Sequence, residues 1–564
     1  MNEVKGQAVV GRIRSWLKKS EGRLPVSCTV RAVKSDFDDV LSSFIFVSKA
    51  LRFGAGCAVN LEEWKRPSSI SNVGNMSLVL DKSHPDFSEF CQVLTNFEPS
   101  GSYDNSIIVA DSMEENINGA TSIENSWIIL ARLLQQGQRV LVDLSNLRPK
   151  GAENGKGLVA SGPASFAKIF VAIQNFIVHP NIQTLCRVYS TINEVLRRGG
   201  LYRNGAVTLY LQYTHPEVKD YIQMPRHELD WAKRALTVDI EVLNSEHLPL
   251  ILAAAEQGDL FLAKKRYTPS GERLYFQVCT EIALKSCDTC LLHHINLGEL
   301  EIDEIPQAFE YGMKFLCELH QHSGIEKLGI YLPPENSRQV GLGVIGLASA
   351  LAIHGIKYRL FVNALENLIE TLCQDTNISS PEGYICVLNH LKNLDKNDLP
   401  WHYSIALALG FMKAAIIARA YGMERAFTIA PTATSSFQYR DAHGFTTTPN
   451  IAPPIALNVL RDSQEFGILE ADYHPFCEIA SEVGFETYFR LCCAWQKLMN
   501  LTGMAHAISF DVWDQQPFNR DFVKRWLLSP LYTTYYRLRT MGLDAVDKSR
   551  VMCDRNAECE SCAT

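Results

Sequence analysis

Arg139-Val-Leu-Val-Asp-Leu144 begins a segment whose pattern predicts the fold of this 564-residue chain. The run is short, apolar and rich in branched side chains, as in a buried strand. A polar, glycine-rich loop follows over residues 148–157, and Ser161-Gly-Pro163 then carries the signals of a helix start. A strand, a loop and a helix in this order predict one unit of an α/β fold.

Similar units lie on both sides of this segment. Towards the N-terminus, Ser35 is the expected cap of a helix that ends at Gly54-Ala-Gly56, and residues 57–61 follow as a short buried strand. Towards the C-terminus, a helix is expected to end at Arg197-Arg-Gly-Gly200, before a strand over residues 206–211. Repeated units of this kind predict an α/β architecture with parallel strands.

Composition excludes several classes of protein. Hydrophobic residues make up 46% and charged residues 21%, which is typical of a globular chain. The net charge of −8 argues against a protein that coats nucleic acid. The most apolar stretch, residues 404–422, contains Lys413 and Arg419, and residues 1–23 lack the apolar core of a signal peptide. We therefore expect a cytoplasmic protein that does not span a membrane.

The 16 cysteines include two CxxC pairs, Cys287 with Cys290 and Cys559 with Cys562. Without a secretory signal, most thiols are expected to be reduced. A four-thiolate zinc site is one interpretation, because CxxC is a common half-site for zinc. The second pair lies at a polar chain end, which favours thiol–disulfide exchange instead.

Two motifs have competing interpretations. Gly341-Leu-Gly-Val-Ile-Gly346 matches a dinucleotide fingerprint, but the polar segment 334–339 stands where the preceding strand should end, so glycines that pack a helix are expected. The loop of residues 430–436 follows a strand expected over residues 425–429 and carries four hydroxyls. It is either a phosphate-binding loop or a simple helix cap.

One internal similarity links two strand–turn segments. Residues 76–80 with His84-Pro-Asp86 resemble residues 207–211 with His215-Pro-Glu217. Two equivalent units and coincidence both explain this match.

Phe276-Gln-Val-Cys-Thr-Glu-Ile282 suggests radical chemistry. In an extended loop, Gln277, Cys279 and Glu281 would face the same side. A carboxylate disfavours a thiolate beside it, so the pair suits a neutral sulfur radical and a separate base. A buried structural cysteine with a surface glutamate is the alternative.

Several collinear segments together resemble the large catalytic subunit of ribonucleotide reductases, in a class I-like short form. They are Ser27-Cys28, Gly54-Ala-Gly56 with Asn60, Arg148-Pro-Lys-Gly151, Ala160-Ser-Gly-Pro163, Arg197-Arg-Gly199, Cys279-Thr-Glu-Ile282, Cys290 six residues before Asn296-Leu297, Arg338 with Gly341-Leu-Gly343, Ile429-Ala-Pro431 through Ser436, Tyr535-Tyr536, and the pair Cys559 and Cys562.

The resemblance implies a ten-stranded α/β barrel made of two five-stranded halves, with a cysteine-bearing finger loop inside. Residues 1–26 would form a short N-terminal segment, residues 27–540 the catalytic barrel with an insertion at about 64–140, and residues 541–564 a redox-active tail. Ribonucleotides, as di- or triphosphates, would be reduced under the control of deoxynucleotide effectors. Only 27 residues precede Cys28, too few for the ATP-cone activity domain of the family.

The resemblance also implies roles for single residues. Cys279 would carry the thiyl radical that removes the 3′ hydrogen, and Glu281 would take the 3′-OH proton. Cys28 and Cys290 would supply two electrons and become a disulfide, Cys290 being preferred to Cys287 by its spacing to Asn296. The tail pair would reduce that disulfide. Substrate contacts are expected from Ser27, Gly56, Thr432, Ala433, Thr434, Ser435 and Ser436.

Three regions bear on substrate positioning and on the effector site. Gln277 replaces the usual Asn, which changes the geometry at the substrate hydroxyls. The 87 residues between Asn60 and Arg148 resemble the insertion of the monomeric cobalamin-dependent branch, where inserted structure takes the place of a dimer partner. The loop of residues 151–161 resembles the one that relays effector identity. Candidate effector residues are Ser35, Asp36, Asp111, Ser112, Arg148 and Lys150.

Tyr535 and Tyr536 resemble the tyrosine dyad of class I enzymes; two packed aromatic rings are the alternative. Class I implies a radical from a metallocofactor in a ferritin-like small subunit, a thioredoxin- or glutaredoxin-like reductant, and a homodimer. This chain itself would bind no metal or other cofactor for catalysis, only an ATP or dNTP effector with Mg²⁺. The alternatives are an adenosylcobalamin-dependent class II enzyme and an inactive nucleotide-binding regulator.

Overall fold

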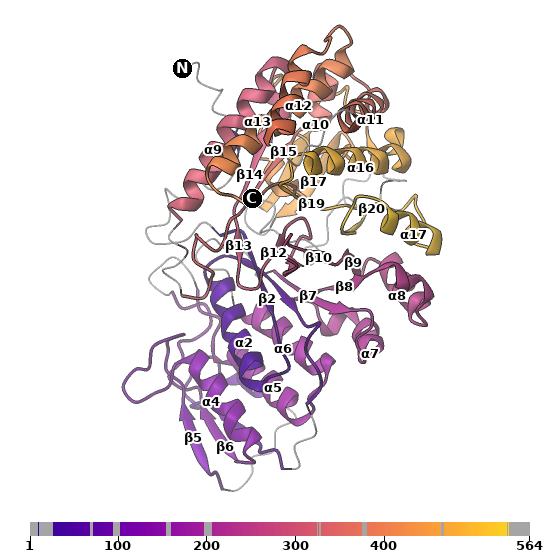
Figure 1. Ribbon diagram of the computed structural model, residues 1–564. Helices are drawn as coiled ribbons and strands as arrows, with labels where there is room; N and C mark the ends of the chain where they lie inside the picture. Colours follow the sequence, from indigo (N-terminus) through magenta and orange to yellow (C-terminus); the bar gives the residue numbers. More distant parts are fainter. Residues whose placement is uncertain are drawn as a thin grey trace. The chain divides into compact units, whose positions relative to one another are not determined.

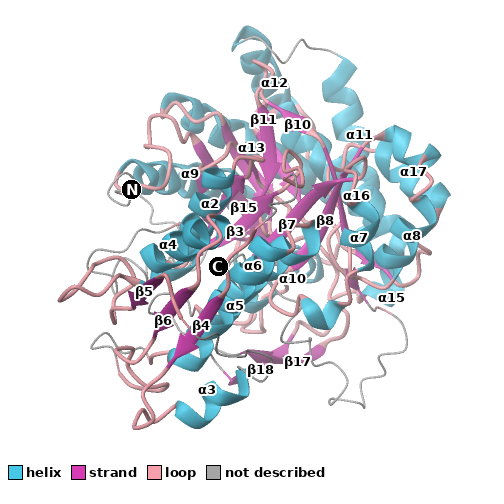
Figure 2. Cartoon of the chain, turned by 90° about the horizontal axis from the view of Figure 1, so that it is seen from below, coloured by secondary structure: helices cyan, strands magenta, loops and turns pink. Residues whose placement is uncertain are grey.

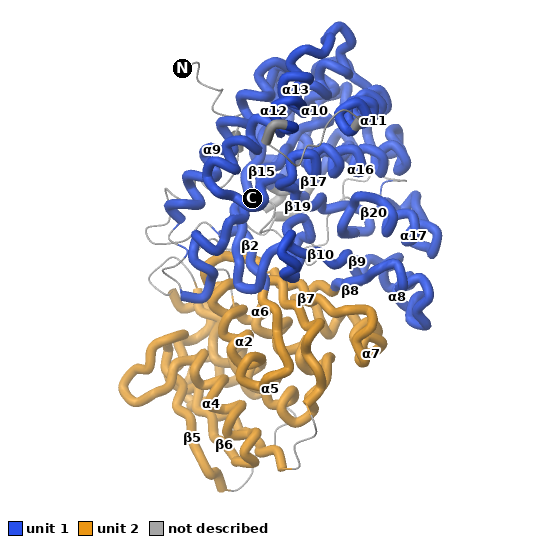
Figure 3. Tube along the Cα trace, viewed as in Figure 1, with its two compact units in different colours: residues 1–30, 235–564 blue, residues 31–234 orange. Residues whose placement is uncertain are grey.

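The computed structural model describes residues 9–10, 26–67, 72–93, 102–153, 159–196, 206–323, 325, 329–374, 381–463, 467–538 and 540. The chain divides into two units, shown in different colours in Figure 3. Unit 1 comprises residues 1–30 and 235–564, and unit 2 comprises residues 31–234.

Unit 1 is built around four neighbouring parallel strands. In order across the sheet they are β14 (Leu292–Asn296), β15 (Gln339–Ile345), β16 (Arg425–Ile429) and β19 (Ala505–Ile508), and β1 (Val9–Val10) pairs antiparallel with β14. Every residue of the four parallel strands is buried. Such strands lie under helices and have nearly continuous apolar sequences.

Helices surround this sheet (Figure 1). Those that pack on its strands include α9 (Ile305–Gln321), α13 (Leu399–Ala420) and α16 (Phe485–Leu501), and α11 (Tyr358–Gln374) packs on α13 and α16. By length and composition α13 could cross a membrane, but 72% of its apolar window is buried inside the protein, as in a core helix. Within the described residues, unit 1 also contains α8 (Leu248–Glu256), α10 (Leu347–Ile353), α12 (Pro381–Asn393), α14 (Ala433–Ser436), α15 (Ala480–Val483) and α17 (Arg520–Leu528).

Short strands complete unit 1. The antiparallel set β10 (Arg266–Tyr267), β11 (Arg273–Phe276) and β12 (Ala283–Leu284) presents the predicted finger loop. The others are β2 (Cys28–Ala32), which continues into unit 2, β8 (Lys233–Val238), which begins there, β9 (Phe261–Lys264), β13 (Thr289–Cys290), β17 (Asn458–Ser463), β18 (Gly467–Asp472), β20 (Val512–Trp513) and β21 (Arg537–Leu538).

Unit 2 contains two groups of parallel strands. Strand β3 (Gly56–Asn60) pairs with β7 (Val207–Gln212), and β6 (Val140–Asp143) lies between β4 (Met76–Val79) and β5 (Asn105–Ile108), as Figure 2 shows. The predicted insertion of about 64–140 therefore contributes β4, β5 and most of a small sheet. The helices are α2 (Phe37–Arg52), α3 (Phe87–Val93), α4 (Ile123–Gln135), α5 (Pro163–Val178), α6 (Ile182–Val195) and α7 (Val218–Gln223).

The prediction of an α/β fold with parallel strands is confirmed, whereas a closed ten-stranded barrel is not shown by the described residues. Two local expectations were wrong. Helix α2 is capped by Asp36 rather than Ser35, because the Asp36 carboxylate accepts the Asp39 N–H at 3.0 Å. The glycines of residues 341–346 do not pack a helix, since Gly341 and Gly343 lie within the buried strand β15.

Candidate active site

The finger loop joins β11 to β12 and is a tight turn. Thr280 N–H donates to Gln277 O at 3.1 Å, Gln277 N–H donates to Ile282 O at 2.9 Å, and Thr280 has a positive φ of 70°. The expectation of an extended loop with alternating side chains is therefore wrong. A hairpin tip this short has to reverse the chain, and Cys279 and Glu281 both lie in this turn.

Gln277 has a role within the loop. Its side-chain oxygen accepts the backbone N–H groups of Cys279 and Thr280, the latter at 2.9 Å. The Gln277 side chain thus caps the tip of the loop from inside.

The backbone of Glu281 is fixed by the strands beside it. Its carbonyl accepts Ala507 N–H at 2.8 Å and the Thr428 hydroxyl at 3.0 Å. Glu281 and Cys279 are fully buried. Gly341 has no side chain, and this leaves room for Ile282. A Cβ added at Gly341 would lie 2.9 Å from the Ile282 Cδ1 atom.

Two further hydroxyls hold the tip of the loop. Ser509 Oγ donates to Cys279 O and lies 3.4 Å from Glu281 Oε2. Thr533 Oγ1 lies 3.4 Å from Thr280 O. Neither residue is predictable from the sequence, because hydroxyl side chains far along the chain carry no local signal of this contact.

Tyr535 and Tyr536 approach the finger-loop cysteine in series. Tyr535 Oη lies 3.4 Å from Cys279 Sγ and 3.2 Å from Tyr536 Oη. The two rings are 4.0 Å apart between centroids, and both pack against Phe261. The dyad lies in the segment just before β21, with Tyr535 buried and Tyr536 half-buried. Two phenols and one thiol thus form a continuous contact chain.

Cys28 and Cys290 face each other across β2 and β13. Directly opposed antiparallel residues have Cα atoms about 4.5–5.5 Å apart, within the range that a disulfide needs. Both thiols are buried and reduced. Burial, followed by the neighbouring Cys28 and Glu281, raises the pKa of Cys290 well above its usual value.

Cys287 does not share this position. It lies three residues before Cys290, and its N–H donates to Val30 O at 2.7 Å. Val30 lies two positions along β2 from Cys28, and Cys287 has a positive φ of 66° in the turn before β13, so Cys287 is not opposite Cys28. Among the described residues, no group of three or more His, Cys, Asp or Glu side chains could hold a metal ion.

The predicted phosphate loop begins where β16 ends. Ser509 N–H donates to Ile429 O at 2.9 Å, so this loop starts beside the residue that holds the finger loop. Thr432 has a positive φ of 52°, and its hydroxyl accepts Asn450 N–H at 2.9 Å. The buried Ser435 hydroxyl has no hydrogen-bond partner among the described residues, whereas Ser436 donates to Ala433 O. The Thr434 side chain is not among those described.

The remaining substrate candidates separate between the units. Ser27 lies in unit 1, and its N–H donates to Cys290 O at 3.0 Å, which places it beside the thiol pair. Gly56 begins β3 in unit 2. Cys559 and Cys562 lie outside the described residues.

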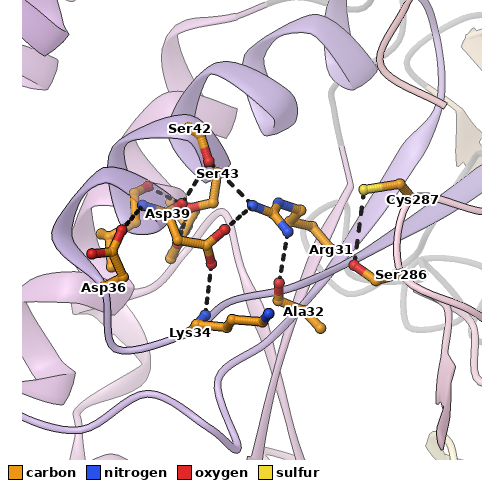
Figure 4. Close-up of polar contacts among 11 residues, drawn as sticks. Arg31, Ala32, Lys34, Asp36, Asp39, Ser42, Ser43, Ser286 and Cys287 are labelled. Carbon is orange, nitrogen blue, oxygen red and sulfur yellow. Dashed lines mark hydrogen bonds and ion pairs between the residues drawn. The ribbon is translucent and has the colours of Figure 1, made fainter. Parts of the chain in front are cut away.

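In unit 2, Ser35 and Asp36 have structural partners at the start of α2. Asp36 caps the helix, and Ser35 Oγ donates to Glu63 O at 2.9 Å. Asp39 binds the Arg31 guanidinium at 2.5 Å and accepts Lys34 N–H at 2.7 Å (Figure 4).

The other effector candidates gather at the loop after β6. The Asp111 carboxylate binds Arg148 Nε at 2.7 Å, and Lys150 Nζ lies 2.9 Å from Glu89. Lys150 N–H donates to Asp86 at 2.8 Å. Ser112 instead accepts Glu115 N–H at 3.2 Å. The insertion thus supplies several of the side chains that hold residues 148–150. Positions 154–158 of this loop lie outside the described residues.

The internal similarity corresponds to equivalent local structures. His84 Nδ1 accepts Asp86 N–H, and His215 Nδ1 accepts Glu217 N–H, each at 3.1 Å. His84 Nε2 lies 2.8 Å from Leu147 O, and His215 Nε2 lies 2.7 Å from Trp64 O. The two His-Pro turns therefore have the same local hydrogen bonds.

The site combines a buried cysteine in contact with two tyrosines, an adjacent carboxylate and an opposed thiol pair. No family model and no curated protein matches the sequence. A B12-dependent (class II) ribonucleotide reductase structure is similar at a TM-score of 0.58 and 12% identity, over 96% of this chain and 82% of that chain. The class Id ribonucleotide reductase alpha subunit of Actinobacillus ureae is similar at 0.50 and 13% identity, over 95% and 87%. The fold is that of ribonucleotide reductase large subunits.

Proposed function

We propose that this chain is the catalytic subunit of a ribonucleotide reductase that removes the 2′-hydroxyl of ribonucleotides by thiyl-radical chemistry. The observation that carries the proposal is the contact chain Tyr536–Tyr535–Cys279, with steps of 3.2 and 3.4 Å. A nucleotide-binding regulator would need neither this chain nor an opposed thiol pair beside it.

Hydrogen-atom transfer from Cys279 to an oxidised Tyr535 gives the sulfur radical. That radical removes the 3′ hydrogen of the ribose while Glu281 takes the 3′-OH proton, and the 2′-OH leaves as water. Cys28 and Cys290 supply two electrons and two protons and become a disulfide. Cys279 then returns the 3′ hydrogen and is again a radical, and Glu281 returns its proton to the 3′ oxygen. One ribonucleotide and two thiols thus give one deoxyribonucleotide, one disulfide and one water.

Substrate phosphates bind the loop of residues 432–436 in this proposal. The buried Ser435 hydroxyl supports this assignment, because it lacks a partner within the described protein. Effector identity is read at the loop that begins at Arg148, and the contacts of Asp86, Glu89 and Asp111 with this loop support a site completed by the insertion. The tail cysteines reduce the disulfide and pass it to a thioredoxin- or glutaredoxin-like protein.

We propose class I as the source of the radical, with a ferritin-like partner subunit whose metallocofactor oxidises Tyr536. The tyrosine contacts favour this route, since a radical formed beside Cys279 itself would not require them. Adenosylcobalamin-dependent (class II) chemistry is the second candidate, because one of the similar structures is a class II enzyme.

The test is deoxynucleotide formation by the chain mixed with a ferritin-like subunit encoded with it, a dithiol, Mg²⁺ and a dNTP effector. Product is expected with the wild type and none with Cys279→Ser, while nucleotide affinity stays within about twofold because the fold does not need that sulfur. A parallel reaction holds adenosylcobalamin in place of the subunit, and activity there would decide for class II. Deoxynucleotide formation by Cys279→Ser would overturn the proposal.

A further inference from the structure

Ser509 lies where the finger loop, the phosphate loop and the central sheet of unit 1 meet. It directly follows β19, its N–H continues the pairing with β16 through Ile429 O at 2.9 Å, and the residue is 2% exposed. Its hydroxyl points at the finger loop, donating to Cys279 O and lying 3.4 Å from Glu281 Oε2. One hydroxyl therefore touches both the radical cysteine's backbone and the proposed base.

A serine hydroxyl has one proton and two lone pairs. Ser509 Oγ lies within donor distance of both Cys279 O and Glu281 Oε2, and the contact with Cys279 O is the shorter one. We therefore assign its single proton to Cys279 O, which leaves its lone pairs for Glu281. An ionised Glu281 has no proton to donate to them, whereas a protonated Glu281 does. The hydrogen bond between the two side chains thus becomes available when Glu281 gains a proton, without any rotation of Ser509.

We propose that Ser509 is a positioning residue for the proton-transfer step: it accepts a hydrogen bond from Glu281 once Glu281 has taken the 3′-OH proton, while its own proton stays on Cys279 O. This inference rests on the proposed function. The transferred proton moves from the substrate oxygen to the Glu281 carboxylate and stays there until Glu281 returns it to the 3′ oxygen at the end of the cycle, and no proton leaves Ser509. Stabilising the protonated acid in this way favours the state in which the 2′-OH departs.

Thr533 provides a matched control. It is also fully buried, and its hydroxyl binds the same loop at Thr280 O, with Ile508 O as its second contact at 3.2 Å. No contact between its hydroxyl and a carboxylate is present in the described structure. Thr533→Val therefore removes only a hydroxyl that binds the finger loop. Ser509→Ala removes both the contact with the loop and the contact with Glu281, whereas Ser509→Thr keeps the hydroxyl.

The first measurement is kcat and KM of the full enzyme between pH 5.5 and 9. Ser509→Ala should lower kcat about 10–100-fold with KM within about twofold, and should move the acid limb of the kcat profile about half a pH unit or more to lower pH. Ser509→Thr should restore kcat to within about fivefold, and Thr533→Val should leave the acid limb in place. The inference would be overturned if the acid limb of Ser509→Ala stayed in place or moved to higher pH. It would also be overturned if Thr533→Val moved the acid limb by the same amount as Ser509→Ala.

The second measurement does not need turnover. An infrared pH titration of the purified chain follows the neutral carboxyl band that disappears in Glu281→Gln. In Ser509→Ala this band should move to higher frequency, because its O–H loses an acceptor, and Thr533→Val should not move it. An unchanged band in Ser509→Ala would refute the contact even if the enzyme proved inactive, whereas a shifted band without turnover would refute only the proposed function.

Discussion

Replacing Tyr535 by phenylalanine removes one oxygen atom from the middle of the proposed radical path. In the wild type, Tyr535 Oη lies 3.4 Å from Cys279 Sγ and 3.2 Å from Tyr536 Oη. Without it, the remaining oxygen and sulfur are separated by a gap of as much as about 6.6 Å, beyond the reach of direct proton transfer. Phenylalanine also has no phenolic proton and is much harder to oxidise.

We expect Tyr535→Phe to lower turnover about 10³-fold or more, which corresponds to about 4 kcal/mol or more in the barrier. The ring keeps its packing on Phe261, whose centroid is 5.0 Å away, so stability should fall by only about 1 kcal/mol for the lost buried hydrogen bond. Nucleotide affinity should not change.

The assay is chromatographic quantification of deoxynucleotide formed with the radical-generating subunit present. Tyr532→Phe is the matched control, because this tyrosine of the same segment packs against Arg266 and Phe276, and its activity should stay within about twofold. If Tyr535→Phe kept a tenth or more of wild-type turnover, the reasoning from the contact chain would be refuted. Full activity of both Tyr535→Phe and Tyr536→Phe with adenosylcobalamin would favour class II.

Three other perturbations have defined outcomes. Replacing Cys559 and Cys562 together by serine should stop turnover with thioredoxin-like reductants but not with a small dithiol; if both reductants fail, metal analysis should test for zinc. Burial raises the pKa of Asp288 to about 7, so the folded state keeps this proton at a pH where the unfolded chain has lost it, and stability falls as pH rises from about 4 to 7. Asp288→Asn keeps an oxygen acceptor but does not titrate. In urea unfolding, the free energy of unfolding should therefore differ between pH 6 and pH 8 by about 1–2 kcal/mol less in this variant than in the wild type. An unchanged difference would contradict this. Gly341→Ala places a Cβ 2.6 Å from Leu292 and 2.9 Å from Ile282. Overpacking should lower the free energy of unfolding by about 1–3 kcal/mol in the same measurement. A variant as stable as the wild type would show that the strand adapts.

Local sequence was sufficient for elements whose cause is local. The strand expected over residues 425–429 is β16, and the strand expected over residues 206–211 is β7 displaced by one residue. Apolar runs between turn residues determine such strands wherever they lie in the chain. The helix start at Asp36 and the strand at Gly341–Ile345 were misjudged, because neighbouring cap residues compete and a fully buried strand lacks the alternation that would reveal it.

The sequence by itself determined which chemical groups are present and in what order: a cysteine near a carboxylate, paired tyrosines, and cysteines that could form a disulfide. Only the tertiary structure decided which of them meet. Tyr535 contacts Cys279 across 256 positions of the chain, and Cys290 lies opposite Cys28 across 262. Ser509 and Thr533 hold the finger loop from strands and segments more than 200 residues away. These contacts depend on sheet register and on a tight hairpin turn, and neither leaves a pattern in the residues that flank each side chain.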